Sequence, residues 1–263
     1  MPFANYAAQT DVGKVRDHNE DCYRVNTDLG LCIIADGMGG HASGEVASRI
    51  AVDAIEMQVD KGESLVFAIE QAHLEIIKGV ATGAGKSGMG TTVVAIQLSE
   101  NNYTLAWVGD SRAYLWDKNL TQLSKDHSLV QMLIDSGKIS KEEARFHPRK
   151  NIIYQNLGSE ETEDFQVSQK QGMLYKNQKL VLCSDGLSDE LDDEVIGEII
   201  KQGVQQSISE ESIVEQLIDA ALTNGGRDNV SIVIVSATAA ASEKPQADKS
   251  NREVDKDTLI PEG

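Results

Sequence analysis

The chain has 263 residues, which is enough for one large domain or two small ones with a substantial hydrophobic core. Its 24 basic and 42 acidic residues give a formal net charge of −18, and because such a surface repels nucleic acid and anionic membranes, we expect neither as a partner. The sequence shows neither an N-terminal signal pattern nor an apolar run long enough to span a bilayer, so we expect a cytoplasmic protein.

Short β-branched or apolar runs and longer amphipathic segments follow one another as far as about Ala237. In chain order they predict a strand at 31–36, helices at 44–59 and 64–80, strands at 91–98, 103–110 and 112–117, a helix at 128–136, a strand at 179–186, helices at 193–202 and 210–223, and a strand at 230–237. Because strands and helices do not alternate one to one, the pattern favours an α+β fold over a doubly wound sheet. Residues 238–263 are poor in apolar residues, and we expect a disordered tail there.

Acidic residues recur where the predicted strands begin or end. They are Asp36, Asp110 and Asp185 after apolar runs, Asp228 before the last strand, and Glu20 and Asp21 in NED. Any one of them alone fits an ordinary turn. If the strands meet at one end of a sheet, however, the carboxylates converge, and their repulsion is costly unless cations lie among them. Oxygen ligands without matching His or Cys select Mg²⁺ or Mn²⁺, and a glycine after Asp36 lets a backbone carbonyl approach such an ion.

Seven segments occur in a fixed order along the chain: RDHNED, ADGMGGHASGE, GMGTTVVA, VGDSRAYL, SKDHSLVQ, LCSDGLSD and GGRDNVSIVIV. They extend from Arg16 to about Val235, nearly the whole chain before the tail. In this order they resemble the motifs of the metal-dependent protein phosphatases, the 2C-type Ser/Thr phosphatases, in their bacterial form. The resemblance implies an αββα sandwich, with two antiparallel sheets flanked by helix pairs. It places a catalytic domain at 1–237, with a flap at about 129–160 beside the active site.

The resemblance also implies a metal centre at one end of the sandwich. Asp36 is expected to bridge two Mn²⁺ or Mg²⁺ ions, and the carbonyl of Gly37 to bind one of them. Asp185 and Asp228 are expected to complete the other. The implied reaction is hydrolysis of protein phosphoserine and phosphothreonine by a hydroxide that bridges the two ions.

Further residues receive roles from the same resemblance. Glu20 and Asp21 are expected to act mainly through metal-bound waters, and Asp21 is counted among the catalytic residues with Arg16 and Asp36. Arg16 is expected to grip the substrate phosphate, since its planar fork matches phosphate oxygens. Asp110, together with Asp185, is expected to hold a third ion. The implied partners are phosphorylated proteins and a cognate Ser/Thr kinase that the enzyme opposes, and we expect a monomer.

Three positions bear on this resemblance. Met38 stands where some members place a histidine proposed as general acid, and methionine cannot donate a proton. His41 lies nearby, with a capping or packing role and a catalytic role both open. Gln155 stands where bacterial members usually carry an arginine, which leaves substrate contacts through the flap undefined.

The sequence lacks the motifs of two other hydrolase classes. None of Cys22, Cys32 and Cys183 has the arginine six residues later that a cysteine-dependent phosphatase needs, and the GxSxG of α/β-hydrolases is absent. Cys32 and Cys183 lie in apolar runs, so we expect buried reduced thiols. A non-enzymatic binding module should lack metal carboxylates that this chain retains. A small-molecule phosphatase with the same two-ion site stays open.

Overall fold

Two antiparallel sheets lie face to face at the centre of the computed structural model, which describes residues 5–39, 43–159 and 165–237. The first sheet has the strand order β1 (Asn5–Asp11), β11 (Val230–Ser236), β10 (Lys179–Cys183), β7 (Arg112–Asp117) and β8 (Asn119–Gln122). The second has the order β2 (Asp21–Asn26), β3 (Leu31–Met38), β5 (Val93–Ser99), β6 (Asn102–Val108) and β9 (Ser168–Met173), with β4 (Gly90–Thr91) paired to β3.

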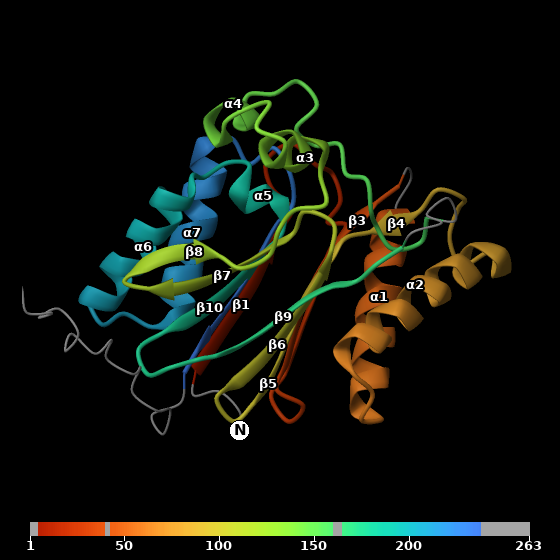
Figure 1. The fold of residues 1–263 in the computed structure, drawn as a ribbon, viewed down its shortest axis with the longest axis horizontal. Coiled ribbons are helices and arrows are strands. Elements are labelled where there is room, and N and C mark those ends of the chain that lie inside the picture. Colours follow the sequence, from red (N-terminus) through yellow and green to blue (C-terminus); the bar gives the residue numbers. More distant parts are fainter. Residues whose placement is uncertain (1–4, 40–42, 160–164, 238–263) are drawn as a thin grey trace, which may run out of the picture.

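Helices cover the outer face of each sheet (Figure 1). The helices α1 (Ser43–Asp60) and α2 (Leu65–Thr82) lie on the second sheet, and α6 (Asp193–Gln205) and α7 (Glu210–Asn224) lie on the first. The start of α2 is set by Ser64, whose side chain accepts the Phe67 N–H, and its end by Gly83 at φ 80°. The result is the αββα sandwich that the sequence predicts.

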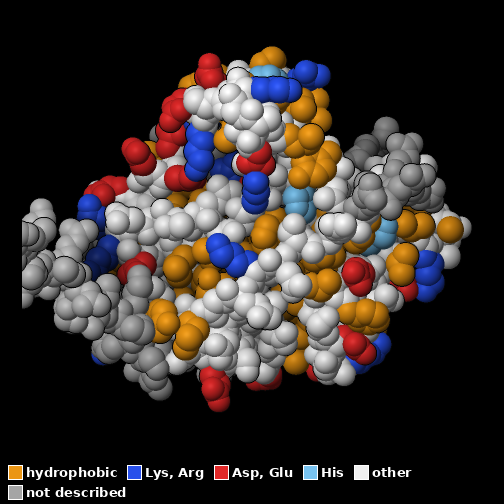
Figure 2. Space-filling model, in the orientation of Figure 1, with side chains coloured by type: hydrophobic (Ala, Val, Ile, Leu, Met, Phe, Trp, Pro, Cys, Tyr) orange, Lys and Arg blue, Asp and Glu red, His pale blue; other side chains and the backbone are white. Residues whose placement is uncertain are grey.

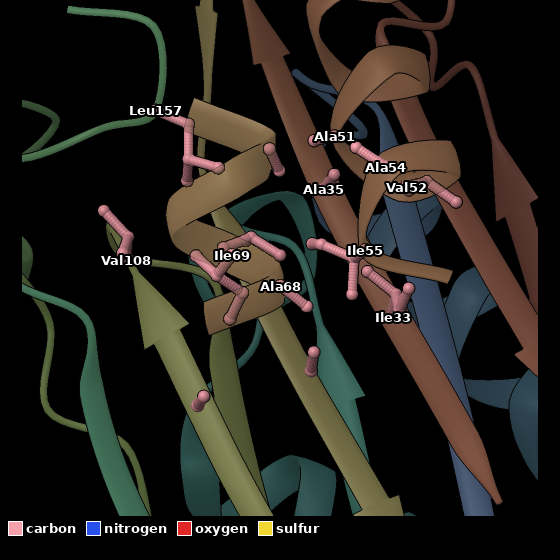
Figure 3. Close-up of a cluster of buried hydrophobic side chains, with 14 of the residues drawn as sticks. Ile33, Ala35, Ala51, Val52, Ala54, Ile55, Ala68, Ile69, Val108 and Leu157 are labelled. Carbon is pink, nitrogen blue, oxygen red and sulfur yellow. The ribbon is translucent and has the colours of Figure 1, made fainter. Parts of the chain in front are cut away.

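The hydrophobic core has three layers that follow from this arrangement. One apolar cluster joins α1 and α2 to the second sheet, and Figure 3 shows Ile55 of α1 beside Ile33 of β3, with Ile69 on the neighbouring helix α2. A second joins α6 and α7 to the first sheet, and a third fills the space between the sheets. Cys32 and Cys183 are free thiols buried in these layers, as predicted, and burial raises the pKa of each to about 12.

The predicted flap segment lies over one end of the sandwich (Figure 1). Its described part contains two short helices, α3 (Leu129–Asp135) and α4 (Lys141–Arg145), the second opened by a capping box between Ser140 and Glu143. Ion pairs connect the segment to the α5–α6 region: Lys150 to Asp189 at 2.5 Å and Arg145 to Asp192 at 2.6 Å. Acidic and basic side chains therefore stand side by side on that face (Figure 2).

Several predicted boundaries were wrong, and each correction concerns a carboxylate. The strand of Asp36 continues to Met38, so Asp36 lies within β3 and not at its tip. The strand before Asp110 ends at Val108, and Asp185 is the first residue of the short helix α5 (Asp185–Ser188). The predicted tail lies outside the described residues. Among the described residues, no helix is long and apolar enough to cross a membrane.

Candidate active site

One pocket at the flap end of the sandwich collects nearly all of the predicted site residues. It is lined from both sheets, from the flap segment and from the loops between, by Arg16, Glu20, Asp36, Gly37, Met38, Gly39, Thr92, Asp110, Asn151, Ile153, Asp185, Asp228 and Asn229. Asp21 is the predicted residue outside this lining. It is buried on β2, directly opposite Asp36 in the strand register.

The backbone of Asp36 is fixed by two threonines, Thr91 at the end of β4 and Thr92 directly after it. The Thr92 N–H and the Thr91 hydroxyl both donate to the Asp36 carbonyl, at 2.9 and 2.8 Å. The Asp36 N–H in turn donates to the Thr92 hydroxyl at 3.2 Å. A Cβ on the next residue, Gly37, would stand 2.2 Å from the Gly44 carbonyl oxygen, so only glycine allows α1 to approach this strand.

Asp21 is held by hydroxyl groups from the other sheet. Its Oδ2 accepts from Ser184 Oγ at 2.8 Å and from Ser231 Oγ at 2.7 Å. Its Oδ1 is buried without a hydrogen-bond partner. Asp21 therefore links β2 to the ends of β10 and β11, with one oxygen unused by the protein.

Asp110 reaches the pocket from a turn after β6, and Asp185 from the start of α5. Gly109 adopts φ 104°, and its N–H donates to His127 Nδ1 at 3.1 Å. His127 precedes Ser128, the N-cap residue of α3, and its ring fixes the turn that carries Asp110. Asp185 is placed by the β10–α5 junction, and its Oδ1 is likewise buried and unpaired.

Asp228 and Arg16 form an ion pair at the pocket, with 2.7 Å between Asp228 Oδ2 and Arg16 Nη2. The neighbouring Asn229 joins their two segments. Its side-chain oxygen accepts the Glu20 N–H at 2.8 Å, and its amide nitrogen donates to the Val12 and His18 carbonyls, each at 2.9 Å. One asparagine, next to Asp228 in the chain, thus holds the segment that carries Arg16 and Glu20.

Four carboxylates of this cluster, Asp21, Asp36, Asp110 and Asp185, have raised pKa values. Burial raises the pKa of Asp36, and the charges of Asp21, Asp185 and Asp110 raise it further. Burial likewise raises the pKa of Asp185, that of Asp21 to about 6 and that of Asp110 to about 7. The hydrogen bond with Asp228 raises the pKa of Arg16. Crowded, desolvated carboxylates of this kind become stable as anions when cations are present.

The donor set fits hard divalent cations. The buried, unpaired oxygens of Asp21 and Asp185 lack the partners that buried polar atoms normally have, and metal coordination or ordered water would supply them. Within the described ranges, no three His, Cys, Asp or Glu side chains are grouped closely enough to hold an ion by themselves. An ion here would draw further ligands from backbone carbonyls and water, as Mg²⁺ commonly does.

Three positions singled out in the sequence have different outcomes. Met38 ends β3 and lines the pocket. Gln155 accepts the Gln166 N–H at 3.0 Å, so its side chain fixes the chain after the flap. His41 lies outside the described residues.

Some pocket residues were missed by sequence reasoning. Asn151 and Ile153 line the pocket from the flap, while Ile152 and Tyr154 between and after them are exposed. Successive residues of an extended segment face opposite sides, but NIIY has no alternation of polar and apolar residues that could have indicated which side faces the pocket. Ser184 and Ser231 had no local signal either, because only the fold brings them to Asp21.

Comparisons with known proteins agree with this geometry. Residues 14–223 match the family model described as protein phosphatase 2C. The chain belongs to the protein phosphatase 2C family. The family is one of protein phosphatases, and the prediction made from the seven motifs is confirmed.

Two members of the phosphatase 2C family illustrate the relationship. The serine/threonine protein phosphatase PstP of Mycobacterium tuberculosis is 39% identical over 236 residues, which cover 87% of this chain and 44% of PstP. The serine/threonine phosphatase stp of Listeria monocytogenes serovar 1/2a is 36% identical over 244 residues, covering 86% of this chain and 93% of stp. The chain thus spans under half of the mycobacterial relative and nearly all of the listerial one.

Solved structures of the family share the fold. The crystal structure of the M. tuberculosis phosphatase PstP/Ppp has a TM-score of 0.79 at 37% identity, covering 89% of this chain and 98% of that one. A second structure, of the PstP catalytic domain in complex with two manganese ions, has a TM-score of 0.77 at 36% identity, covering 88% and 97%. The 2C-type sandwich predicted from the sequence is therefore confirmed.

Proposed function

We propose that this chain is a metal-dependent protein Ser/Thr phosphatase that uses two Mn²⁺ or Mg²⁺ ions. The observation that supports it most is the meeting of Asp36, Asp185 and Asp228 with Arg16 in one pocket, although these residues come from distant parts of the chain. Membership of the phosphatase 2C family supports the same activity, and the manganese ions of the PstP structure support the choice of metal.

Within this proposal, Asp36 lies between the two ions, and the Gly37 carbonyl, Asp185 and Asp228 complete their ligands. Glu20 and Asp21 would act through water, which fits their positions beside and behind Asp36. Two divalent ions bound there would lower the pKa of water and offset the negative charge of the phosphoryl group. A third ion at Asp110 and Asp185 is part of the proposal, since the charge of Asp110 raises the pKa of Asp185, and a cation between them would offset the cost of ionising both.

The protein's own groups orient the substrate. The Arg16 guanidinium is half-exposed at the pocket, so it can turn from Asp228 to the phosphate oxygens of a bound phosphoresidue. The backbone of Asp36, in contrast, is held in place, because its N–H and its carbonyl are hydrogen-bonded to Thr91 and Thr92. A half-exposed arginine thus faces a carboxylate that projects from a fixed backbone.

Phosphoproteins, the targets of a cognate Ser/Thr kinase, are the proposed substrates, and a monomeric cytoplasmic enzyme is the proposed form. A phosphatase of small phosphoesters is the alternative, because the two-ion chemistry does not depend on the leaving group's size. Relative turnover of phosphothreonine peptides and small phosphoesters separates the two.

The deciding experiment measures hydrolysis of p-nitrophenyl phosphate and a phosphothreonine peptide with and without Mn²⁺ or Mg²⁺, beside the Asp36→Asn variant. We expect turnover that requires the metal and is lost in the variant. A folded wild-type protein without turnover under any of these conditions would refute the proposal and favour a binding module.

A further inference from the structure

We propose that Glu190, acting through Arg227, is the positioning residue that holds Asp228 in place for metal binding. The inference rests on the proposed metal-dependent function, and it concerns two residues that lie outside the pocket lining. Both belong to segments that carry predicted metal ligands: Glu190 follows α5, which begins with Asp185, and Arg227 directly precedes Asp228.

The contact between Glu190 and Arg227 is unusually complete. The Glu190 side chain is 2% exposed. Its Oε1 accepts from the Arg227 backbone N–H at 3.0 Å and from Nε at 2.9 Å, and its Oε2 accepts from Nη2 at 2.8 Å. One carboxylate therefore fixes both the backbone and the side chain of the residue next to Asp228. These hydrogen bonds lower the pKa of Glu190, which keeps it ionised.

The turn after α7 is shaped around the same carboxylate. Gly225 has φ 154°, and a Cβ there would stand 2.9 Å from Glu190 Oε2. The Asn224 side chain donates to the Glu190 carbonyl oxygen. The residues before Arg227 thus wrap the Glu190 side chain closely, and a larger residue than glycine would displace it.

The opposite side of this loop rests on the N-terminal turn that carries Arg16. The Lys14 N–H donates to the Gly226 carbonyl at 2.7 Å, and a Cβ on Gly13 would stand 2.2 Å from the Asp228 carbonyl oxygen. The loop is therefore held between that turn and Glu190. Without Glu190, the loop keeps its contacts to the N-terminal turn and to the end of α7 but loses every hydrogen bond that fixes Arg227 to the α5 side.

The Glu190–Arg227 pair connects the segment that carries Asp185 to the segment that carries Asp228. Helix α5 joins Asp185 to Glu190 within six residues, and the Glu190–Arg227 pair joins that helix to Asp228. Loss of the pair should let Asp228 move relative to Asp185. Groups that orient metal ligands in this way typically affect metal affinity by about 10-fold to 100-fold when removed.

The test is Mn²⁺ binding to the metal-free full chain, measured by titration calorimetry and by the paramagnetic resonance signal of free Mn²⁺. The variants are Glu190→Gln and Arg227→Lys, which keep the side-chain volume nearly unchanged. Glu210→Gln is the matched control, because Glu210 forms a similarly buried pair with Lys179 at 2.7 Å near Ser236, at the far end of β11. We expect the Kd for Mn²⁺ to rise about tenfold or more in both variants. The Kd of the Glu210→Gln control should stay within about twofold of the wild-type value. Excess Mn²⁺ should restore turnover in Glu190→Gln and Arg227→Lys.

An unchanged Kd in a folded Glu190→Gln protein would overturn the inference, as would an equal rise in the control. If Glu190→Gln does not fold, Arg227→Lys decides, because it keeps the positive charge and loses only the planar fork. A wild-type protein that binds no Mn²⁺ would instead refute the proposed function. If wild type binds Mn²⁺ and both variants bind it with the same Kd, only the role of Glu190 is refuted and the proposed function stands.

Discussion

Asp21 lies directly opposite Asp36 in the antiparallel register of β2 and β3. Like charges placed opposite each other on paired strands destabilise a sheet, and these two carboxylates are also withdrawn from water. The Asp21 charge is the second cause, after burial, of the raised pKa of Asp36. The metal-free protein therefore carries an electrostatic cost at the end of the sandwich where the proposed cations bind.

Asp36→Asn should abolish turnover and at the same time raise the melting temperature of the metal-free protein, because it removes one of the two opposed charges. We expect a rise of about 2–4 °C for each kcal/mol of repulsion removed. Thermal unfolding in EDTA measures it. Wild type should gain further stability from Mn²⁺ and the variant little. A lower metal-free melting temperature than wild type, or turnover near the wild-type level, would contradict this.

The metal-free protein should be more stable near pH 5 than near pH 7.5. The pKa of Asp21 is raised from 3.8 to about 6, so the folded state binds this proton more tightly than the unfolded chain. Its contribution, on the order of 2 kcal/mol, is present below about pH 4 and lost as the pH rises through about 6. Denaturant unfolding in EDTA at several pH values measures it.

Asp21→Asn should reduce the slope of that pH profile without removing it, because burial also raises the pKa of Asp110, to about 7. The exposed Asp53→Asn changes the net charge by the same amount and should leave the slope unchanged. An Asp21→Asn profile with the slope of wild type would show that other groups cause the dependence.

Arg16→Ala should raise KM for phosphopeptides by about tenfold or more, with a smaller effect on kcat, because a charge-assisted contact to the phosphate is lost. Arg24→Ala is the control, since Arg24 is an arginine paired with Asp53 and Glu56 on the surface. Steady-state kinetics at saturating Mn²⁺ distinguish the two. A collapsed kcat at unchanged KM would show that Arg16 serves another purpose.

Gly37→Ala should destabilise the fold by roughly 1–3 kcal/mol or more, because the added methyl group would meet backbone atoms of Gly44 and Glu20 that cannot move aside. Gly197→Ala is a useful comparison. It lies in α6, where the nearest atom is Leu120 Cβ at 3.2 Å and alanine favours the helix. Equal stability of the two variants in denaturant would show that α1 is not packed against β3 as closely as described.

The sequence predicts those parts of the fold whose residues are apolar on at least one face. The strands β3, β5, β6, β10 and β11 and the helices α1, α2, α6 and α7 were all found within a few residues of their ends. The strands β1 and β9 were missed because NYAAQTD and SQKQGM contain few apolar residues and are mostly not buried. They form because β11 and β6 offer open edges for pairing, which is a tertiary effect.

The sequence likewise predicts some residues of the candidate site and not others. Asp36, Asp110 and Asp185 could be found in the sequence because they follow apolar runs, and Asp228 because it directly precedes one. Glu190 and Ser231 could not, because a glutamate before a helix and a serine in a strand have no distinctive local pattern. Their partners, Arg227 and Asp21, are 37 and 210 residues away in the chain. Only the folded arrangement shows what they do.

The hydroxyl bonds that hold Asp21 have a mechanical consequence. Asp36 belongs to one sheet, whereas Ser231 belongs to the other and Ser184 directly follows that sheet's strand β10. A cation placed at this end would connect the two sheets, while apolar packing holds them together elsewhere. Loss of the metal should therefore weaken the contact between the two sheets at this end only. In the metal-free protein, amide protons near Asp21 should exchange faster, while those near Ser236 keep their protection. The two sheets would then separate locally at the Asp21 end and stay packed at the other end.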